Sequence, residues 1–161
     1  MSGPNIRWMI LRDMPQIYEI ENQSFPEPWP KEEFMKVLKT KSCIGFVAEV
    51  DDTIQGFMIY QCSQDAYELV NLAVGEEYRR QGVANKLVRH LLDKMVKFNK
   101  RQLQAYISER NLNAQLFFKQ LGFKASVVRN YYNKDHDAYL FVKNSLSAGT
   151  NKERDEACQG V

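Results

Sequence analysis

The feature that most constrains this chain is the run RRQGVA at residues 79–84, which stands between a strand-like and a helix-like segment. The segment before it, Tyr67 to Val74, is apolar enough for a strand, and the segment after it, Val83 to about Phe98, has apolar residues at helical spacing. Gly82 lets the backbone approach a ligand closely. The unpaired N–H groups and the positive end of the helix then face an anion. The run therefore predicts a binding site for a phosphorylated cofactor.

The turn differs from the common nucleotide loops. The chain contains no G-x-x-x-x-G-K-[ST] run, and Gly82 stands alone, so the dinucleotide pattern G-x-G-x-x-G is absent as well. The pattern R-x-x-G-x-A resembles the coenzyme A pyrophosphate loop of the GNAT acetyltransferase superfamily. A second landmark, residues 111–123 (NLNAQLFFKQLGF), resembles the N-x-x-A-x-x-(F/L)-(Y/F)-x-x-x-G-F helix of that superfamily. It reads as a short helix that Gly122 ends in a left-handed cap, with Phe123 folded back.

The resemblance implies that acetyl-CoA (coenzyme A) is the cofactor. In this superfamily a splayed fourth strand offers backbone N–H groups to the acetyl and pantetheine parts, the glycine loop holds the pyrophosphate, and the second helix contributes to the pantetheine arm. The residues that match these places are Leu72, Ala73, Val74, Arg79, Arg80, Gln81, Gly82, Val83, Ala84, Asn85, Asn111 and Phe118.

The hydrophobic pattern predicts alternating strands and helices in the order βααβββαβαββ, and hence an α/β fold with a mixed, mostly antiparallel central sheet flanked by helices. This is also the GNAT order. Expected strands cover 6–11, 44–50, 53–61, 65–74, 102–107, 125–130 and 138–142, and expected helices cover 14–24, 31–38, 83–98 and 111–121. Asp13 is expected to cap the first helix. We expect one domain over residues 1–144 and a polar, mobile tail over 145–161.

Composition excludes several other classes of protein. A net charge of +2 is too close to zero to indicate binding to nucleic acid. The three cysteines are scattered and lack the spacing of a metal site, so no metal is predicted. No apolar run is long enough to span a membrane and no signal peptide is visible, so we expect a cytoplasmic protein. The sequence does not determine the oligomeric state.

Within the superfamily, three stretches are most similar to the N-terminal acetyltransferases of the bacterial RimI type. They are residues 21–29 (ENQSFPEPW), 71–74 (NLAV) and 129–132 (RNYY) followed by Asp137-Ala138. The resemblance implies acetyl transfer to the α-amino group of a protein, for the RimI type a ribosomal protein with an N-terminal alanine. The first and third stretches would wall the peptide groove, with substrate contacts from Phe25, Pro26, Trp29, Tyr131 and Tyr132.

The catalytic places depart from the family pattern. The reaction needs a base for the incoming ammonium and benefits from an acid for the leaving thiolate. Where RimI-type enzymes have a fifth-strand glutamate, this chain has Tyr106, a poor base at neutral pH unless it relays through water. Glu68 on the fourth strand and Glu27 in the proline-rich loop are the alternative bases. The family usually has a tyrosine in the second landmark that serves as general acid, and this chain has Phe118 there. Either the thiolate leaves unassisted, or the hydroxyl of Tyr132 or Tyr131 donates the proton.

Three functions stay open from the sequence. The favoured one is a protein N-terminal α-amino acetyltransferase. The second is a GNAT N-acetyltransferase of a small amine such as a polyamine, an antibiotic or an amino acid. The third is a catalytically weak acyl-CoA-binding module, which the residues Tyr106 and Phe118 at the usual catalytic places would fit.

Overall fold

The computed structural model describes residues 3–132 and 136–145. The chain divides into two compact units: a first unit of Met1–Cys62 and Val70–Asp93, and a second unit of Ser63–Leu69 and Lys94–Val161. The single domain over residues 1–144 stays a prediction. Ser145, expected to begin the tail, is buried, and its N–H donates to the Arg101 carbonyl at 2.9 Å. The remainder of the predicted tail lies outside the described residues.

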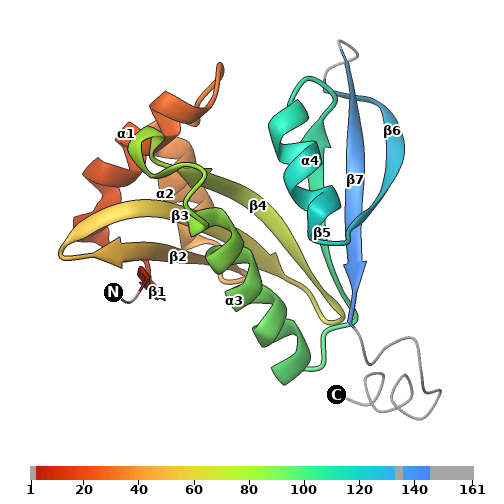
Figure 1. Ribbon diagram of the computed structural model, residues 1–161, viewed down its shortest axis with the longest axis horizontal. Coiled ribbons are helices and arrows are strands. Elements are labelled where there is room, and N and C mark those ends of the chain that lie inside the picture. The colour runs from red at the N-terminus through yellow and green to blue at the C-terminus, as the bar shows by residue number, and fades with distance from the viewer. Residues whose placement is uncertain (1–2, 133–135, 146–161) are drawn as a thin grey trace. The chain divides into compact units, whose positions relative to one another are not determined.

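The described strands and α-helices follow the predicted order, and the mixed, mostly antiparallel fold is confirmed (Figure 1). The strands are ordered β1-β2-β3-β4-β5-β7-β6. β4 and β5 pair in parallel, whereas β1–β2, β2–β3, β5–β7 and β6–β7 pair antiparallel. The elements are β1 (Asn5–Trp8), α1 (Met14–Ser24), α2 (Lys31–Lys39), β2 (Cys43–Val50), β3 (Thr53–Cys62), β4 (Ala66–Val74), α3 (Val83–Lys97), β5 (Gln102–Ser108), α4 (Leu112–Gln120), β6 (Lys124–Tyr132) and β7 (His136–Asn144), with short 3-10 turns η1 (Leu11–Asp13) and η2 (Glu76–Tyr78).

The core of the first unit forms where α1 and α2 bury their apolar stripes against the β2–β3 hairpin. Ile17 of α1 and Phe34 of α2 are fully buried, as are Val47 and Phe57 of the hairpin. The hairpin turns at Asp51 and Asp52, as predicted, and both residues have positive φ. Aspartate tolerates this conformation better than most residues, which makes the turn local in origin.

The start of the chain departs from the expectation. The strand ends at Trp8 instead of Leu11, and Asp13 stands at the predicted N-cap position of α1 but makes no side-chain capping hydrogen bond there. Instead the Asp13 carboxylate accepts the Ile10 N–H at 2.9 Å and two guanidinium hydrogen bonds from Arg7, each 2.8 Å long. Burial alone would raise the pKa of Asp13, but these hydrogen bonds outweigh burial and lower it. The side chain therefore ends the strand early by taking a backbone donor.

The second unit packs α4 on its strands, and Figure 1 shows α4 beside β5 and β7. Phe118 of α4 is buried among Phe117, Phe123 and Phe141, with ring centroids 5.1, 5.1 and 5.9 Å away. Gly122 has φ +87°, and the Phe123 N–H donates back to the Phe118 carbonyl at 3.1 Å. The predicted glycine cap of this helix is thus confirmed, and it folds Phe123 into the core.

Candidate active site

The last part of β4 lies in the first unit and presents two different faces. Burial alternates along the strand, so Asn71 and Ala73 are buried while Leu72 and Val74 are half-buried. Alternation of this kind places Leu72 and Val74 together on the more open face. Of the three residues predicted for the cofactor strand, Ala73 therefore supports the core, and Leu72 and Val74 are left to face a ligand.

The turn after β4 is tied down on one side by Arg79. Its Nε donates to the Val74 carbonyl at 3.0 Å, and its Nη2 donates to Ser24 Oγ at 3.0 Å and to the Gln23 carbonyl at 3.4 Å. The Gly75 N–H in the same turn donates to the Gln55 carbonyl at 2.8 Å. The Arg79 side chain thus holds the turn against the end of α1, which leaves its charge less available to a phosphate than the predicted role implies.

The backbone of the turn has the geometry of an anion cradle. Arg80 has φ +62° and Gly82 has φ +84°, and both are exposed. A Cβ atom added at Gly82 would meet no atom within 4 Å, so the space in front of the turn is open. The first helical hydrogen bond of α3 joins the Lys86 N–H to the Gly82 carbonyl at 2.9 Å, which leaves the N–H groups of the first turn unpaired within the helix.

These unpaired groups belong to Val83, Ala84 and Asn85. Asn85 is further held by Arg89, whose Nε donates to its Oδ1 at 2.8 Å, and the Gln81 Nε2 donates to the Glu77 carbonyl at 2.9 Å. Backbone donors at the positive end of a helix, with an open space before them, suit a phosphate group. The residues present therefore fit the diphosphate part of a coenzyme.

The proline-rich loop between α1 and α2 divides into anchored and exposed residues. Phe25 and Trp29 are partly buried and pack on the core of the first unit, with the Trp29 ring 5.2 Å from Phe34. Pro26 and Glu27 are exposed. Of the residues predicted to contact substrate, Phe25 and Trp29 thus also anchor the loop, while Pro26 lies at its surface beside Glu27, one of the candidate bases.

Sequence reasoning missed the most unusual group of the first unit, Glu21. Its side chain is only 2% exposed, and its Oε2 accepts a hydrogen bond from Asn71 Nδ2 at 2.7 Å. Its Oε1 accepts the Trp29 N–H at 3.5 Å. Burial raises the pKa of Glu21, although both hydrogen bonds act in the opposite direction. The sequence marked Glu21 only as the first residue of the stretch 21–29 (ENQSFPEPW) and as a glutamate one residue after Ile20, and neither position assigned it a role.

In the second unit, Glu68 is held by a chain of side-chain amides. Gln104 is its register partner on β5, and Gln104 Nε2 donates to Glu68 Oε1 at 3.0 Å. Gln102 Nε2 in turn donates to Gln104 Oε1 at 3.1 Å, which turns the Gln104 donor toward the carboxylate. Glu68 is half-buried. One of its oxygens is thus oriented by Gln104, a residue that sequence reasoning had not singled out.

Tyr106 stands beside Tyr131 in the second unit. The two rings are stacked, with centroids 4.7 Å apart and an interplanar angle of 10°. Tyr106 is half-buried and Tyr131 is more exposed. The structure therefore brings together a residue predicted for catalysis and one predicted for substrate binding. The side chain of Tyr132 lies outside the described part of the chain.

The two remaining predicted residues lie on or next to α4. Asn111 caps the helix, because its Oδ1 accepts the Ala114 N–H at 3.1 Å. Its side-chain amide hydrogens are left for a ligand. Phe118 is 2% exposed and enclosed by other phenylalanines, which leaves it no surface for a cofactor. In this structure Phe118 therefore serves the core of the second unit.

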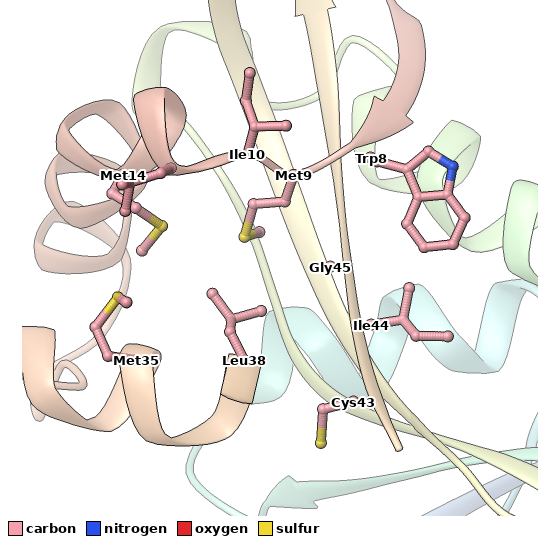
Figure 2. Close-up of a pocket in the computed structure, with 10 residues that line it drawn as sticks. Trp8, Met9, Ile10, Met14, Met35, Leu38, Cys43, Ile44 and Gly45 are labelled. Carbon is pink, nitrogen blue, oxygen red and sulfur yellow. The ribbon is translucent and has the colours of Figure 1, made fainter. Parts of the chain in front are cut away.

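A separate apolar pocket of about 330 Å³ lies in the first unit. Figure 2 shows Met9, Met14, Met35 and Leu38 converging on the space between the two N-terminal helices and β2. None of the predicted site residues lines it. Its walls carry no carboxylate, imidazole or cation that would support acyl transfer.

Within residues 3–132 and 136–145, no three His, Cys, Asp or Glu side chains gather in a way that would hold a metal ion. Among those same residues, no helix has the length and apolar character needed to cross a bilayer.

Comparison with known proteins places the chain among the acetyltransferases. Residues 14–123 match the model of the acetyltransferase (GNAT) family. The chain is 32% identical over 151 residues to an N-alpha-acetyltransferase of Sulfurisphaera tokodaii, covering 85% of this chain and 90% of that protein. It is 31% identical over 121 residues to the ribosomal protein bS18-alanine N-acetyltransferase of Escherichia coli strain K12, covering 74% of this chain and 81% of that protein.

A solved structure gives the same result. The crystal structure of the ribosomal-protein-S18-alanine N-acetyltransferase from Escherichia coli superposes with a TM-score of 0.80 at 28% sequence identity. The superposition covers 91% of this chain and 97% of the other.

Proposed function

The chain belongs to the GNAT family of acetyltransferases, and we propose that it moves an acetyl group from acetyl-CoA to the N-terminal α-amino group of a protein. The observation that carries this proposal is the turn at residues 80–82, with its two positive φ angles and open space at the head of α3. The names of the relatives support the α-amine as acceptor.

The chain's own residues would bind the coenzyme mainly through backbone groups. The N–H groups of Gly82, Val83, Ala84 and Asn85 would hold the pyrophosphate, supported by Arg80 and Gln81. Leu72 and Val74 would contact the acetyl end and the pantetheine, with the Asn111 amide along the arm. When bound, acetyl-CoA supplies the acetyl group as a thioester, which reacts with a neutral amine. Arg79 would keep the turn in place through Ser24 and Val74.

We propose Glu68 as the base, and its support is the hydrogen bond from Gln104, which orients the carboxylate. It would take the proton of the incoming ammonium on Oε2, directly or through one water, because Gln104 already occupies Oε1. Glu27 is exposed in the loop, where nothing in the structure orients it toward a reacting group. Tyr106 is stacked on Tyr131, and we propose that its ring lines the acceptor site or that its hydroxyl holds a water.

The acceptor would be a protein N-terminus that begins with a small residue. Phe25, Pro26, Trp29 and Tyr131 would contact its first residues, with Tyr132 as a further candidate. Aromatic side chains combine apolar surface with hydrogen-bonding groups, which suits the binding of an extended peptide. A ribosomal protein with an N-terminal alanine is the specific target we propose, acting in the cytoplasm, by analogy with the bS18-alanine enzyme.

The test is mass spectrometry of a peptide library with free N-termini, incubated with the full chain and acetyl-CoA. We expect one acetyl group on the α-amine of peptides that begin with Ala or Ser. Glu68→Gln should lower kcat by roughly 10²-fold or more, the usual contribution of a general base, whereas Glu27→Gln should change it little. A chain that binds acetyl-CoA but acetylates only small amines, or nothing, would remove the proposal.

A further inference from the structure

Glu21 occupies a position that ordinary packing does not explain. It lies in the last turns of α1, almost fully buried, and its two hydrogen-bond donors, Asn71 Nδ2 and the Trp29 N–H, are both uncharged. A buried carboxylate without an opposite charge is costly, because the donors replace only part of its lost hydration. An apolar residue here would leave the Asn71 amide and the Trp29 N–H without their acceptor, so the carboxylate joins two segments that packing alone would not join.

Glu21 contacts both ends of the loop that leads from α1 to α2. At the start of the loop, its carbonyl accepts the Phe25 N–H at 3.3 Å. At the far end, its side chain accepts the Trp29 N–H at 3.5 Å. The prolines at 26, 28 and 30 have no N–H to donate, so few backbone hydrogen bonds are open to this segment. The packing of Phe25 and Trp29 on the core and the Glu21 side chain, which accepts the Trp29 N–H, therefore hold the loop together.

The same carboxylate also reaches the strand that precedes the anion cradle. Asn71 of β4 lies fifty residues away in sequence, and its side chain is buried on the face opposite Leu72. Neighbouring residues of α1 hold the cradle itself, since Gln23 Oε1 accepts the Glu76 N–H at 3.3 Å and Ser24 Oγ accepts the Arg79 guanidinium. One turn of α1 thus holds both the loop and the turn after β4.

We propose that Glu21 is a positioning residue for the acceptor peptide. Its carboxylate fixes the loop of residues 25–30 at a set distance from β4, so that Phe25, Pro26 and Trp29 form a wall for the first residues of the peptide. The inference rests on the proposed function in one respect, namely that this loop binds the acceptor. Both Glu21 oxygens are needed, because Asn71 and Trp29 are both donors.

The test compares Glu21→Gln with a matched control, Glu49→Gln, in the full chain. Glutamine keeps the shape of the side chain but has only one acceptor oxygen, whereas the Asn71 amide and the Trp29 N–H each donate to a separate oxygen of Glu21. Glu49 is also partly buried and hydrogen-bonded, to Arg7, and does not contact the loop. Amide hydrogen exchange in the absence of ligands and the KM values for peptide and acetyl-CoA are measured for each.

We expect Glu21→Gln to speed exchange of the Trp29 amide by about tenfold, the effect of losing one hydrogen bond, and to raise the peptide KM by a similar factor. The KM for acetyl-CoA should change by less than about twofold, since the cradle keeps its own anchors. Glu49→Gln should leave all three values near those of the wild type. If Glu21→Gln does not fold, Glu21→Asp, which keeps the charge but shortens its reach, replaces it.

The inference is overturned if exchange in the loop equals that of the control, or if exchange is faster but the peptide KM is unchanged. A rise in both KM values together would also overturn it, because it would indicate general damage to the first unit. If the wild-type chain acetylates no peptide, the proposed function is wrong, whatever the result for Glu21. Hydrogen exchange still decides whether Glu21 holds the loop.

Discussion

Replacing Gly82 by alanine should have two effects that can be measured separately, one on the backbone conformation of the turn and one on the space for a ligand. Its φ of +84° is costly for a residue with a Cβ, by about 1–2 kcal/mol. The added methyl group meets nothing within 4 Å, so no steric clash adds to this strain. For a chain of this length we expect the melting temperature to fall by roughly 2–8 °C. The fold itself should persist.

The second effect concerns the ligand. The space in front of Gly82 is where a diphosphate would approach the backbone, and the methyl group would occupy part of it. We expect the affinity for coenzyme A, measured by isothermal titration calorimetry, to fall at least about tenfold, or about 1.4 kcal/mol. Gly82→Asn should weaken binding similarly with a smaller loss of stability, because asparagine tolerates positive φ better than alanine.

Gly122→Ala is the matched control. Gly122 has nearly the same backbone angle, φ +87°, but lies at the end of α4, and its added Cβ would come within 2.9 Å of Lys143 Nζ, which donates to the Leu121 carbonyl. It should therefore lose at least as much stability as Gly82→Ala and still bind coenzyme A normally. The reasoning is refuted if Gly82→Ala binds coenzyme A as tightly as Gly122→Ala does, or if its melting temperature does not change.

Two further predictions concern the first unit. Phe34→Ala should lower the free energy of unfolding by about 3–5 kcal/mol, because the fully buried ring contacts Tyr18, Trp29 and Phe57. Urea unfolding measures this free energy, and a loss of less than about 1 kcal/mol would contradict this packing. Asp13→Asn should cost roughly 2 kcal/mol at pH 7. Because the pKa of Asp13 is lowered in the folded chain, its ion pair with Arg7 stabilises the fold above about pH 4, and this stabilisation is lost as the pH falls further. The free energies of unfolding of the wild type and of Asp13→Asn should therefore converge in acid. A constant difference between them down to about pH 2 would be evidence against this role.

Much of the fold was predictable because its signals are local. The helix over residues 14–24 and the hairpin turn at Asp51 and Asp52 appear where apolar spacing and turn chemistry placed them. The glycine cap at Gly122 was equally predictable, since only the residue itself and its helical neighbours take part. The first strand was predicted too long because its end depends on Asp13, whose carboxylate competes for a backbone donor.

Parts of the candidate site could not be predicted, because their partners lie far apart in sequence. Arg79 reads as a phosphate ligand by its position in the motif, yet its guanidinium is bound to Ser24, fifty-five residues earlier. Gln104 gave no signal until the parallel pairing of β4 and β5 set it opposite Glu68. Sequence spacing cannot tell which side chains meet across a sheet, because strand register is decided by the packing of whole elements.

By itself, the sequence determined the order of elements, the glycine turn before α3 and the family resemblance that the comparisons confirmed. These depend on backbone preferences and on periodicity within a few residues. Only the tertiary structure decided that Arg79 holds the turn, that Phe118 is a core residue, and that Glu21 is buried between Asn71 and Trp29. Those outcomes are set by burial and hydrogen bonding between distant segments, which exist only once the chain has folded.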